Sequence, residues 1–173
     1  KKYHGWKPYL FLGEQLKDKV LGIIGLGKIG SSLAARVHSG LGMKVVYHDV
    51  VHNAQFEKAN MAKFLPIETL LKTADFVSLH VPLLPSTKHL ISTKQLRMMK
   101  KTAYLINTSR GPVVDEKALV RALQKKVIAG AGLTKVGDHW DKSILDLAVD
   151  VATAALKDAG IATPDQIIIG NMF

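Results

Sequence analysis

The sequence predicts an α/β fold, in the form of a doubly wound parallel sheet with helices on both faces, followed by a short C-terminal helix-strand appendage. Two observations support this prediction. Short apolar runs alternate with helical segments from residue 20 to residue 130, and alternation at this spacing favours parallel strands joined by right-handed crossovers. Hydrophobic residues make up 47% of the 173 residues, which is enough to bury a core between such layers.

The predicted elements follow one another without an internal repeat. The first strand is predicted at 20–24, because a short continuous apolar run that ends in glycine is typical of a buried parallel strand. A helix follows at 29–39, in which Leu33 and Val37 stand four residues apart on one face. Further strands are predicted at 44–49, 76–80, 103–107 and 127–129, and further helices at 68–74, 92–99 and 115–124.

The last forty residues differ from the rest in charge and in pattern. Residues 1–133 contain 21 Lys and Arg against 8 Asp and Glu, whereas residues 134–173 contain 3 against 6. An amphipathic helix is predicted at 143–159 and a strand at 167–169. We therefore predict a domain at 1–133 and an incomplete appendage at 134–173. Because a lone helix cannot bury its own apolar stripe, it must pack on the sheet or on a second copy of the chain, which favours a homodimer.

Composition excludes several classes of function. The net charge of +10 comes from basic residues spread singly or in pairs, without interleaved aromatic residues, so we predict no nucleic-acid partner. No apolar run approaches the roughly 18–20 residues of a membrane span, so we expect no membrane association and a cytoplasmic location. The chain has no cysteine and its histidines lack metal-ligand spacing, so no metal site is predicted.

A glycine-rich motif directly follows the first predicted strand and opens the first predicted helix. It reads Gly25-Leu26-Gly27-Lys28-Ile29-Gly30, the G-x-G-x-x-G pattern of a dinucleotide-binding Rossmann unit. Gly25 permits a tight turn, Gly27 lets a pyrophosphate approach the backbone, and Gly30 lets the helix pack closely on the strand. The helix N-terminus offers free N–H groups and a positive dipole end to the phosphates.

An acidic residue stands where such a unit binds ribose. Asp49 lies nineteen residues after Gly30, at the end of the second predicted strand. Its carboxylate can accept hydrogen bonds from the adenosine ribose hydroxyls, and its charge would repel the 2′-phosphate of NADP. We therefore predict NAD as the cofactor, in preference to NADP.

Three stretches of the chain resemble the signature motifs of the D-2-hydroxyacid dehydrogenases. They span residues 22–30, 80–87 and 107–115, in the family's order and spacing, and residues 128–133 match as well. Residues 5–13 are similar to the lead-in of the glyoxylate/hydroxypyruvate reductase branch. The resemblance covers residues 3–133. It implies an NAD-dependent oxidoreductase that exchanges a hydride with a small 2-oxo/2-hydroxyacid such as glyoxylate.

The same resemblance implies roles for individual residues. Arg110 matches the arginine whose planar fork holds the carboxylate and carbonyl of a 2-oxoacid, and it is the one residue that we assign to catalysis. Val81 and Pro82 would shape the adenosine side of the cleft, while Thr87, Asn107 and Thr108 would lie near the pyrophosphate and the nicotinamide ribose. The predicted cofactor-binding residues are Gly25, Gly27, Lys28, Ile29, Gly30, Asp49, Val81, Pro82, Thr87, Asn107, Thr108 and Arg110.

The sequence also departs from the family's pattern. Thr134 stands where the family has an aspartate, and the catalytic glutamate, the catalytic histidine and the substrate domain have no counterpart. Since hydride transfer needs an acid–base partner besides the cofactor, we expect the chain to bind NAD far better than it catalyses, as a truncated or fused chain would. Two alternatives stay open. One is a non-catalytic dinucleotide-binding module or relic fusion, and the other is a structural piece whose tail docks on a partner.

Residues 127–173 resemble a second family, the N-terminal stretch of thiolases of the acetyl-CoA acetyltransferase type. The run 127–133 fits both families. Thiolase chemistry needs a nucleophilic cysteine, and the chain contains none, so we predict an interaction segment rather than a thiolase activity. The remaining similarity lies in residues 132–143, 146–148, 154–160 and 168–172.

Overall fold

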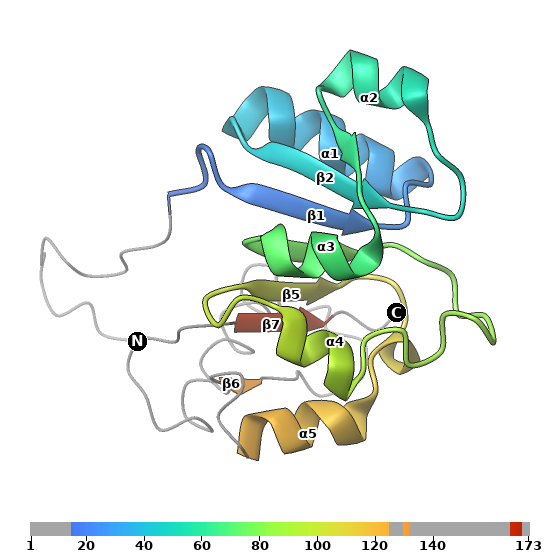
Figure 1. Cartoon of the computed structure of the whole chain (residues 1–173), viewed down its shortest axis with the longest axis vertical. Coiled ribbons are helices and arrows are strands. Elements are labelled where there is room, and N and C mark those ends of the chain that lie inside the picture. Colours follow the sequence, from blue (N-terminus) through green and yellow to red (C-terminus); the bar gives the residue numbers. More distant parts are fainter. Residues whose placement is uncertain (1–14, 125–129, 132–166, 171–173) are drawn as a thin grey trace, which may run out of the picture.

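The computed structural model describes residues 15–124, 130–131 and 167–170, and these residues form a doubly wound parallel sheet (Figure 1). The strand order is β3-β2-β1-β4-β5-β7-β6, and every pairing is parallel. The strands are β1 (Val20–Ile24), β2 (Lys44–His48), β3 (Lys63–Phe64), β4 (Phe76–Leu79), β5 (Tyr104–Asn107), β6 (Gly130–Ala131) and β7 (Ile167–Gly170). The helices are α1 (Lys28–Leu41), α2 (Ala54–Asn60), α3 (Ile67–Thr73), α4 (Thr93–Met98) and α5 (Glu116–Gln124), with a short 3₁₀ helix at Gly111–Val113.

Two separate apolar clusters cover the two faces of the sheet, because side chains of a strand alternate between faces. Leu21 and Ile23 of β1 belong to the cluster under α1 and α2. Ile24 belongs to the cluster under α3, α4 and α5. Gly22 faces α3, where an added Cβ would lie 2.6 Å from Cδ2 of Leu70. A glycine in this central strand therefore lets α3 pack closely on the sheet.

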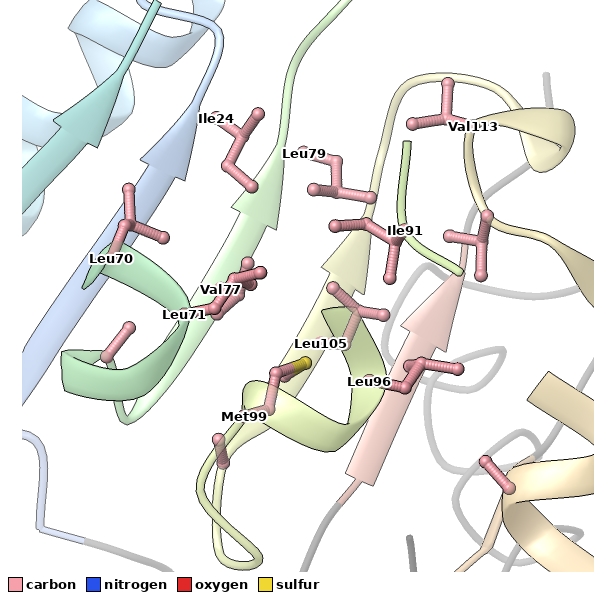
Figure 2. Packing of buried hydrophobic residues seen from close by; sticks show 14 of the residues in the cluster. Ile24, Leu70, Leu71, Val77, Leu79, Ile91, Leu96, Met99, Leu105 and Val113 are labelled. Carbon is pink, nitrogen blue, oxygen red and sulfur yellow. The ribbon is translucent and has the colours of Figure 1, made fainter. Parts of the chain in front are cut away.

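The larger cluster fills the space between the sheet and α3, α4 and α5 (Figure 2). Figure 2 shows Val77 of β4 and Leu105 of β5 among side chains from α3 and α4, including Leu70 and Leu96. Val77, Leu105 and Leu70 have no exposed surface. Burying one such side chain stabilises the fold by roughly 1.5–3 kcal/mol, so this cluster anchors the centre of the sheet.

The prediction of a doubly wound parallel sheet is confirmed. The strands expected at 20–24, 44–49, 76–80 and 103–107 and the helices expected at 29–39, 68–74, 92–99 and 115–124 correspond to β1, β2, β4, β5, α1, α3, α4 and α5, with ends that differ by one or two residues. The first helix runs further than expected, to Leu41. Gly42 ends it at φ 63°, where its N–H bonds the carbonyl of Val37.

Helix α2 and strand β3 are absent from the prediction, and β6 lies just beyond the strand predicted at 127–129. Helix α2 has no buried residue, so its sequence carries no apolar stripe to reveal it. Strand β3 has only two residues, too few to show alternation. The predicted strand at 127–129 and the predicted helix at 143–159 lie outside the described residues.

The strand expected at 167–169 is present as β7, and it lies inside the sheet. It pairs with β5 through Leu105–Ile168, Ile106–Ile169 and Asn107–Gly170, and its other edge pairs with β6. Of the predicted appendage at 134–173, β7 is the part that the structure describes. The division at residue 133 stays a prediction. Strand β7, which belongs to the predicted appendage, is nevertheless part of the sheet.

Candidate functional site

The turns that follow β1, β4 and β5 meet at the carboxyl edge of the sheet. Ile24 pairs with Leu79, and Leu79 pairs with Asn107, so the three strands end side by side. The arrowheads of β1 and β5 point the same way in Figure 1, and β4 is parallel to both. In open α/β sheets, ligands bind outside the carboxyl ends of the strands. This edge therefore holds the glycine motif and the turns of the two other signature stretches, at 80–87 and 107–115.

The three glycines of the motif differ in the space that surrounds them. Gly25 has φ +96°, and an added Cβ would lie 2.7 Å from the carbonyl oxygen of His80. At Gly30 an added Cβ would overlap the carbonyl oxygen of Gly25. An added Cβ at Gly27 meets nothing within 4 Å. The fold itself thus needs Gly25 and Gly30, whereas Gly27 leaves open space that a ligand can approach.

The N-terminus of α1 is open to an anion. Gly27 caps the helix without any side-chain hydrogen bond, and the first turn contains no acidic residue. The first N–H groups of a helix have no acceptor within it. Lys28 and Ile29 are exposed here, with Ile29 71% accessible. Backbone dipoles and the Lys28 ammonium therefore make this position favourable for a phosphate.

Asp49 follows β2 and braces the glycine turn. Its Oδ2 accepts a hydrogen bond from the N–H of Leu26 at 2.6 Å, and its Oδ1 accepts one from the N–H of Val50 at 2.6 Å. The N–H of Val51 lies 3.5 Å from Oδ1. The side chain is half-buried, so the carboxylate has a fixed position beside the turn. This arrangement keeps a negative charge beside the backbone of the glycine motif.

The turn after β4 contains three of the predicted residues. Val81 packs towards the glycine turn, since its Cγ1 lies 3.0 Å from a Cβ added at Gly25. Thr87 closes the turn: its hydroxyl donates to the carbonyl of Pro82 at 2.5 Å and accepts from the N–H of Leu84 at 2.8 Å. The structure therefore gives Thr87 a role in shaping this loop, in addition to the predicted contact with the cofactor.

The turn after β5 is built around Asn107, which is buried. Its Oδ1 accepts hydrogen bonds from the N–H and the hydroxyl of Ser109, at 3.0 and 2.7 Å, and its Nδ2 donates to the carbonyl of Arg110 at 2.9 Å. Thr108 and Arg110 are exposed on this turn. The guanidinium of Arg110 donates to the carbonyl of Ser109 at 2.8 Å. Asn107 is thus a residue that shapes the turn, and Arg110 is presented to solvent.

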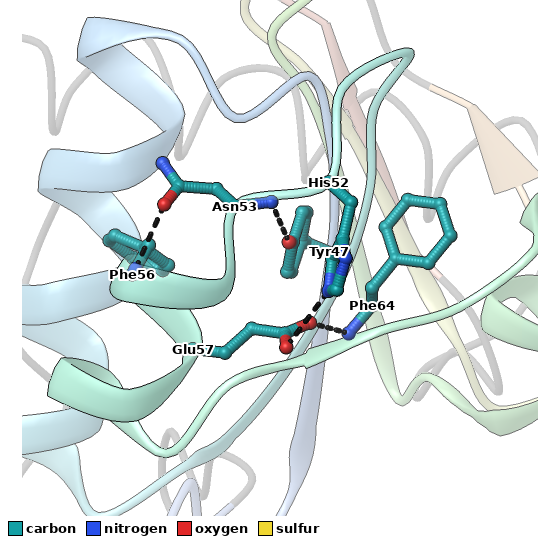
Figure 3. A network of polar contacts seen from close by, with 6 residues as sticks. All are labelled: Tyr47, His52, Asn53, Phe56, Glu57 and Phe64. Atoms are coloured by element: carbon teal, nitrogen blue, oxygen red, sulfur yellow. Dashed lines mark hydrogen bonds and ion pairs between the residues drawn. The ribbon is translucent and has the colours of Figure 1, made fainter.

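A polar network beside the site was not predicted from the sequence (Figure 3). The buried Tyr47 hydroxyl accepts from the N–H of Asn53 at 2.8 Å, and Asn53 caps α2 through the N–H of Phe56 at 2.9 Å. Burial is the main cause that raises the pKa of Tyr47. These contacts hold the end of the segment 49–53. The N-cap asparagine was the one signal in the sequence that could have located α2.

Glu57 of α2 completes this network. Its Oε2 lies 3.0 Å from Nε2 of His52, and its Oε1 accepts from the N–H of Phe64 at 2.7 Å. The hydrogen bond with His52 is the main cause that lowers the pKa of Glu57. The network therefore links α2, β3 and the segment that carries Asp49.

Two further features concern the part of the chain that the structure describes. No group of three or more His, Cys, Asp or Glu side chains there is arranged to hold a metal ion. No helix among the same residues combines the length and apolar character that crossing a membrane requires.

Comparison with known proteins identifies the family. The sequence model of the D-isomer specific 2-hydroxyacid dehydrogenase NAD binding domain matches residues 1–144. The glyoxylate reductase of Thermococcus litoralis is 52% identical over 129 residues, which are 75% of this chain and 39% of the relative. The glyoxylate reductase of Korarchaeum cryptofilum is 50% identical over 128 residues, or 74% of this chain and 38% of the relative. The chain thus spans less than two-fifths of the length of these relatives.

Solved structures give the same result. The NAD complexed form of a D-isomer specific 2-hydroxyacid dehydrogenase from Lactobacillus delbrueckii ssp. bulgaricus has a TM-score of 0.65 at 37% identity, covering 95% of this chain and 49% of that one. D-lactate dehydrogenase with NAD+ from Lactobacillus jensenii has a TM-score of 0.65 at 36% identity, covering 95% and 48%. The chain belongs to the D-isomer specific 2-hydroxyacid dehydrogenases and carries their NAD-binding domain.

Proposed function

We propose that the carboxyl edge of the sheet binds NAD(H) and presents Arg110 to a small 2-oxo/2-hydroxyacid such as glyoxylate. The observation that carries this proposal is the open space at Gly27, which lies between the uncapped N-terminus of α1 and the fixed carboxylate of Asp49. A pyrophosphate needs close approach to backbone N–H groups, and a ribose needs a hydrogen-bond acceptor. The N-terminus of α1 meets the first requirement, and the Asp49 carboxylate beside the glycine turn meets the second.

Each predicted residue has a distinct task in this proposal. The α1 N–H groups and Lys28 would hold the pyrophosphate, and the Asp49 carboxylate would accept from the adenosine ribose. Val81 and Pro82 would border the adenosine, with Thr87 and Asn107 keeping the two neighbouring turns in shape. Bound NAD would supply the hydride acceptor, and NADH the donor.

Arg110 is the residue that would orient the substrate. It is exposed, and the structure gives its guanidinium one hydrogen bond within the described residues, to its neighbour Ser109. The remaining N–H donors form a planar fork that suits the carboxylate and carbonyl of a 2-oxoacid. Glyoxylate is the substrate named for the two archaeal relatives, and it has this chemistry.

The experiment measures binding separately from turnover. The family's catalytic glutamate and histidine, which act as the acid–base pair, have no counterpart among the residues assigned above. NADH is titrated into the chain and followed by its fluorescence, and glyoxylate is then added. We expect saturable NADH binding, a further change with glyoxylate, and negligible steady-state oxidation of NADH. Arg110→Ala should abolish the glyoxylate response and leave NADH affinity within about threefold. Arg97→Ala, which removes an exposed arginine from α4, is the matched control.

The outcomes separate the alternatives. Absence of NADH binding by the unmutated chain would refute the proposal and favour a structural role. NADH binding without any glyoxylate response would favour a non-catalytic dinucleotide-binding module. Robust oxidation of NADH, lost in Arg110→Ala, would show that other residues supply the acid–base pair.

Three further parts of the proposal concern the rest of the chain. We propose that residues 127–173 include a thiolase-like interaction segment, that the protein forms a homodimer, and that it resides in the cytoplasm. The first two rest on the sequence similarity and on the apolar stripe predicted at 143–159. The match of the dehydrogenase sequence model extends to residue 144. The two similarities therefore overlap over residues 127–144.

A further inference from the structure

We propose that His80 is a positioning residue that fixes the turn carrying Thr108 and Arg110 relative to the glycine turn. The assignment of a ligand to this edge rests on the proposed function, whereas the positioning itself rests on contacts within the fold. In the sequence, His80 is one of the histidines that lack metal-ligand spacing. Its surroundings in the structure indicate a specific role.

The backbone of His80 is in contact with the glycine turn. His80 directly follows β4, which lies between β1 and β5 in the sheet. Its N–H donates to the carbonyl of Ile24 at 2.8 Å, which extends the β1–β4 ladder to the last residue before the motif. Its carbonyl oxygen lies 2.7 Å from a Cβ added at Gly25. The backbone of His80 is therefore packed closely against the turn that begins at Gly25.

The side chain of His80 reaches in the other direction, towards the turn after β5. Its Nε2 lies 2.8 Å from Oγ of Ser78, a residue only 2% exposed. Its Nδ1 lies 3.3 Å from Oγ1 of Thr108. The neutral imidazole ring has one donor and one acceptor, and a hydroxyl can serve either, so both contacts are satisfied together. Burial lowers the pKa of His80, which favours the neutral ring.

The two contacts place His80 between a buried residue of β4 and an exposed residue of the turn after β5. Ser78 lies within β4 and is buried, so it holds the ring in one orientation. Thr108 is exposed at the start of the turn, and its hydroxyl also lies 3.4 Å from the carbonyl of Leu79. Asn107 holds the same turn from inside, through the carbonyl of Arg110. His80 and Asn107 thus hold the turn on two sides and set where Arg110 emerges.

The consequence for binding is geometric. The glycine turn and Arg110 belong to different strands, so the distance between their ligands depends on how β4 connects them. A displacement of about 1 Å between groups that hold reacting partners can cost about a hundredfold in rate. Loss of the His80 contact should therefore weaken the response to glyoxylate more than it weakens NADH binding.

The test compares three substitutions that keep different atoms of the ring. His80→Asn keeps a polar atom near the place of Nδ1, facing Thr108. His80→Gln keeps one near the place of Nε2, facing Ser78. His80→Leu removes both. We expect His80→Leu and His80→Gln to weaken glyoxylate binding to the NADH complex about tenfold, and His80→Asn to stay within about threefold of the unmutated chain.

Two controls accompany these variants. Thr108→Val should reproduce the effect of His80→Leu on glyoxylate binding, and the double variant should add nothing further, because both changes remove the contact between His80 and Thr108. His38→Leu removes a half-buried histidine of α1 that bonds Met43, away from the carboxyl edge, and should leave glyoxylate binding unchanged. Equal losses in His80→Asn and His80→Leu, or additive effects of His80→Leu and Thr108→Val, would overturn the proposal.

A second readout needs no cofactor. In ¹H–¹⁵N NMR spectra of the free chain, the Arg110 amide peak should move in His80→Leu and His80→Gln and stay in place in His80→Asn. An Arg110 amide peak that stays in place in all three variants would overturn the positioning role. If the unmutated chain binds no NADH, the proposed function fails, and the NMR spectra still decide whether His80 fixes the turn.

Discussion

The carboxylate of Asp49 accepts a hydrogen bond of 2.6 Å from the backbone N–H of Leu26, the residue between the first two glycines of the motif. The residue predicted to bind the ribose therefore also holds the turn predicted to bind the pyrophosphate. Two substitutions separate these tasks. Asparagine keeps an oxygen that can accept from Leu26 but loses the charge, whereas alanine loses both.

We predict that the unmutated chain prefers NADH over NADPH and that both Asp49→Asn and Asp49→Ala narrow this preference, because each removes the charge that repels a 2′-phosphate. Asp49→Ala should in addition weaken NADH binding up to about tenfold beyond Asp49→Asn, since a hydrogen bond to a neutral acceptor contributes about 0.5–1.5 kcal/mol. Fluorescence titration with both cofactors measures this. Equal affinities of the unmutated chain for NADH and NADPH would contradict the assignment of Asp49.

The glycines of the motif give a prediction about stability and binding together. Gly27→Ala should leave the melting temperature nearly unchanged, because its Cβ meets nothing within 4 Å, but it should weaken NADH binding at least tenfold by filling the approach to the backbone. Gly25→Ala should lower the melting temperature by roughly 2–8 °C. Its φ of +96° costs a side chain about 1–2 kcal/mol, and the added Cβ also meets His80.

Thermal unfolding and NADH titration of both variants test this contrast. Gly40→Ala is a suitable control, since an added Cβ there also meets nothing within 4 Å and lies far along α1 from the turn. A Gly27→Ala chain that binds NADH normally would show that the cofactor does not approach the backbone at this glycine.

The sequence could predict this edge of the site because its signals are local. The glycine pattern, the strand before it and the acid after the next strand each lie within a short window, and all of them are present in the structure. The roles of Tyr47 and His80 could not be predicted, because their partners Asn53 and Thr108 meet them through the fold of the chain. The position of β7 between β5 and β6 depends likewise on which strand edges remain open, a property that no single segment encodes.

A pH-dependent stability is expected from Asp75, at the opposite edge of the sheet. Its Oδ2 accepts from the N–H of Val20 and its Oδ1 from Nζ of Lys100, both at 2.8 Å. Burial raises the pKa of Asp75, but the hydrogen bonds from Lys100 and Val20 lower it by more. The net result is a pKa below the ordinary 3.8. A carboxylate with a lowered pKa stabilises the fold above its unfolded pKa, and this contribution is lost as pH falls through the folded pKa.

Asp75→Asn should therefore reduce the free energy of unfolding by roughly 1–2 kcal/mol at pH 7, and this difference from the unmutated chain should shrink below pH 4. Urea unfolding at several pH values measures it. Asp18→Asn alters an exposed carboxylate and should show little difference at any pH. A difference for Asp75→Asn that stays constant down to pH 2 would contradict the role of its charge.

The last prediction concerns β7 and the proposed division at residue 133. A chain that ends at Leu133 loses β7, so Leu105, Ile106 and Asn107 of β5 lose their neighbour, and β6 loses the strand through which it joins the sheet. The glycine motif and Asp49 directly follow β1 and β2, on the far side of β4. We therefore expect the shortened chain to bind NADH within about threefold of the full chain but to unfold at a lower temperature, since an open strand edge leaves backbone groups unpaired.

A full-length variant separates loss of the strand from loss of the whole tail. Ile168→Pro removes one backbone donor from β7, and proline is not tolerated in a central strand, so it should lower the melting temperature in the same direction as the truncation. Sedimentation of both chains adds the oligomeric state. A homodimer held by the predicted helix at 143–159 should persist in Ile168→Pro and disappear in the shortened chain. If the shortened chain is unfolded, residues 134–173 are part of the core and the two-part division is wrong; if it is as stable as the full chain, pairing of β7 with β5 contributes nothing to the fold.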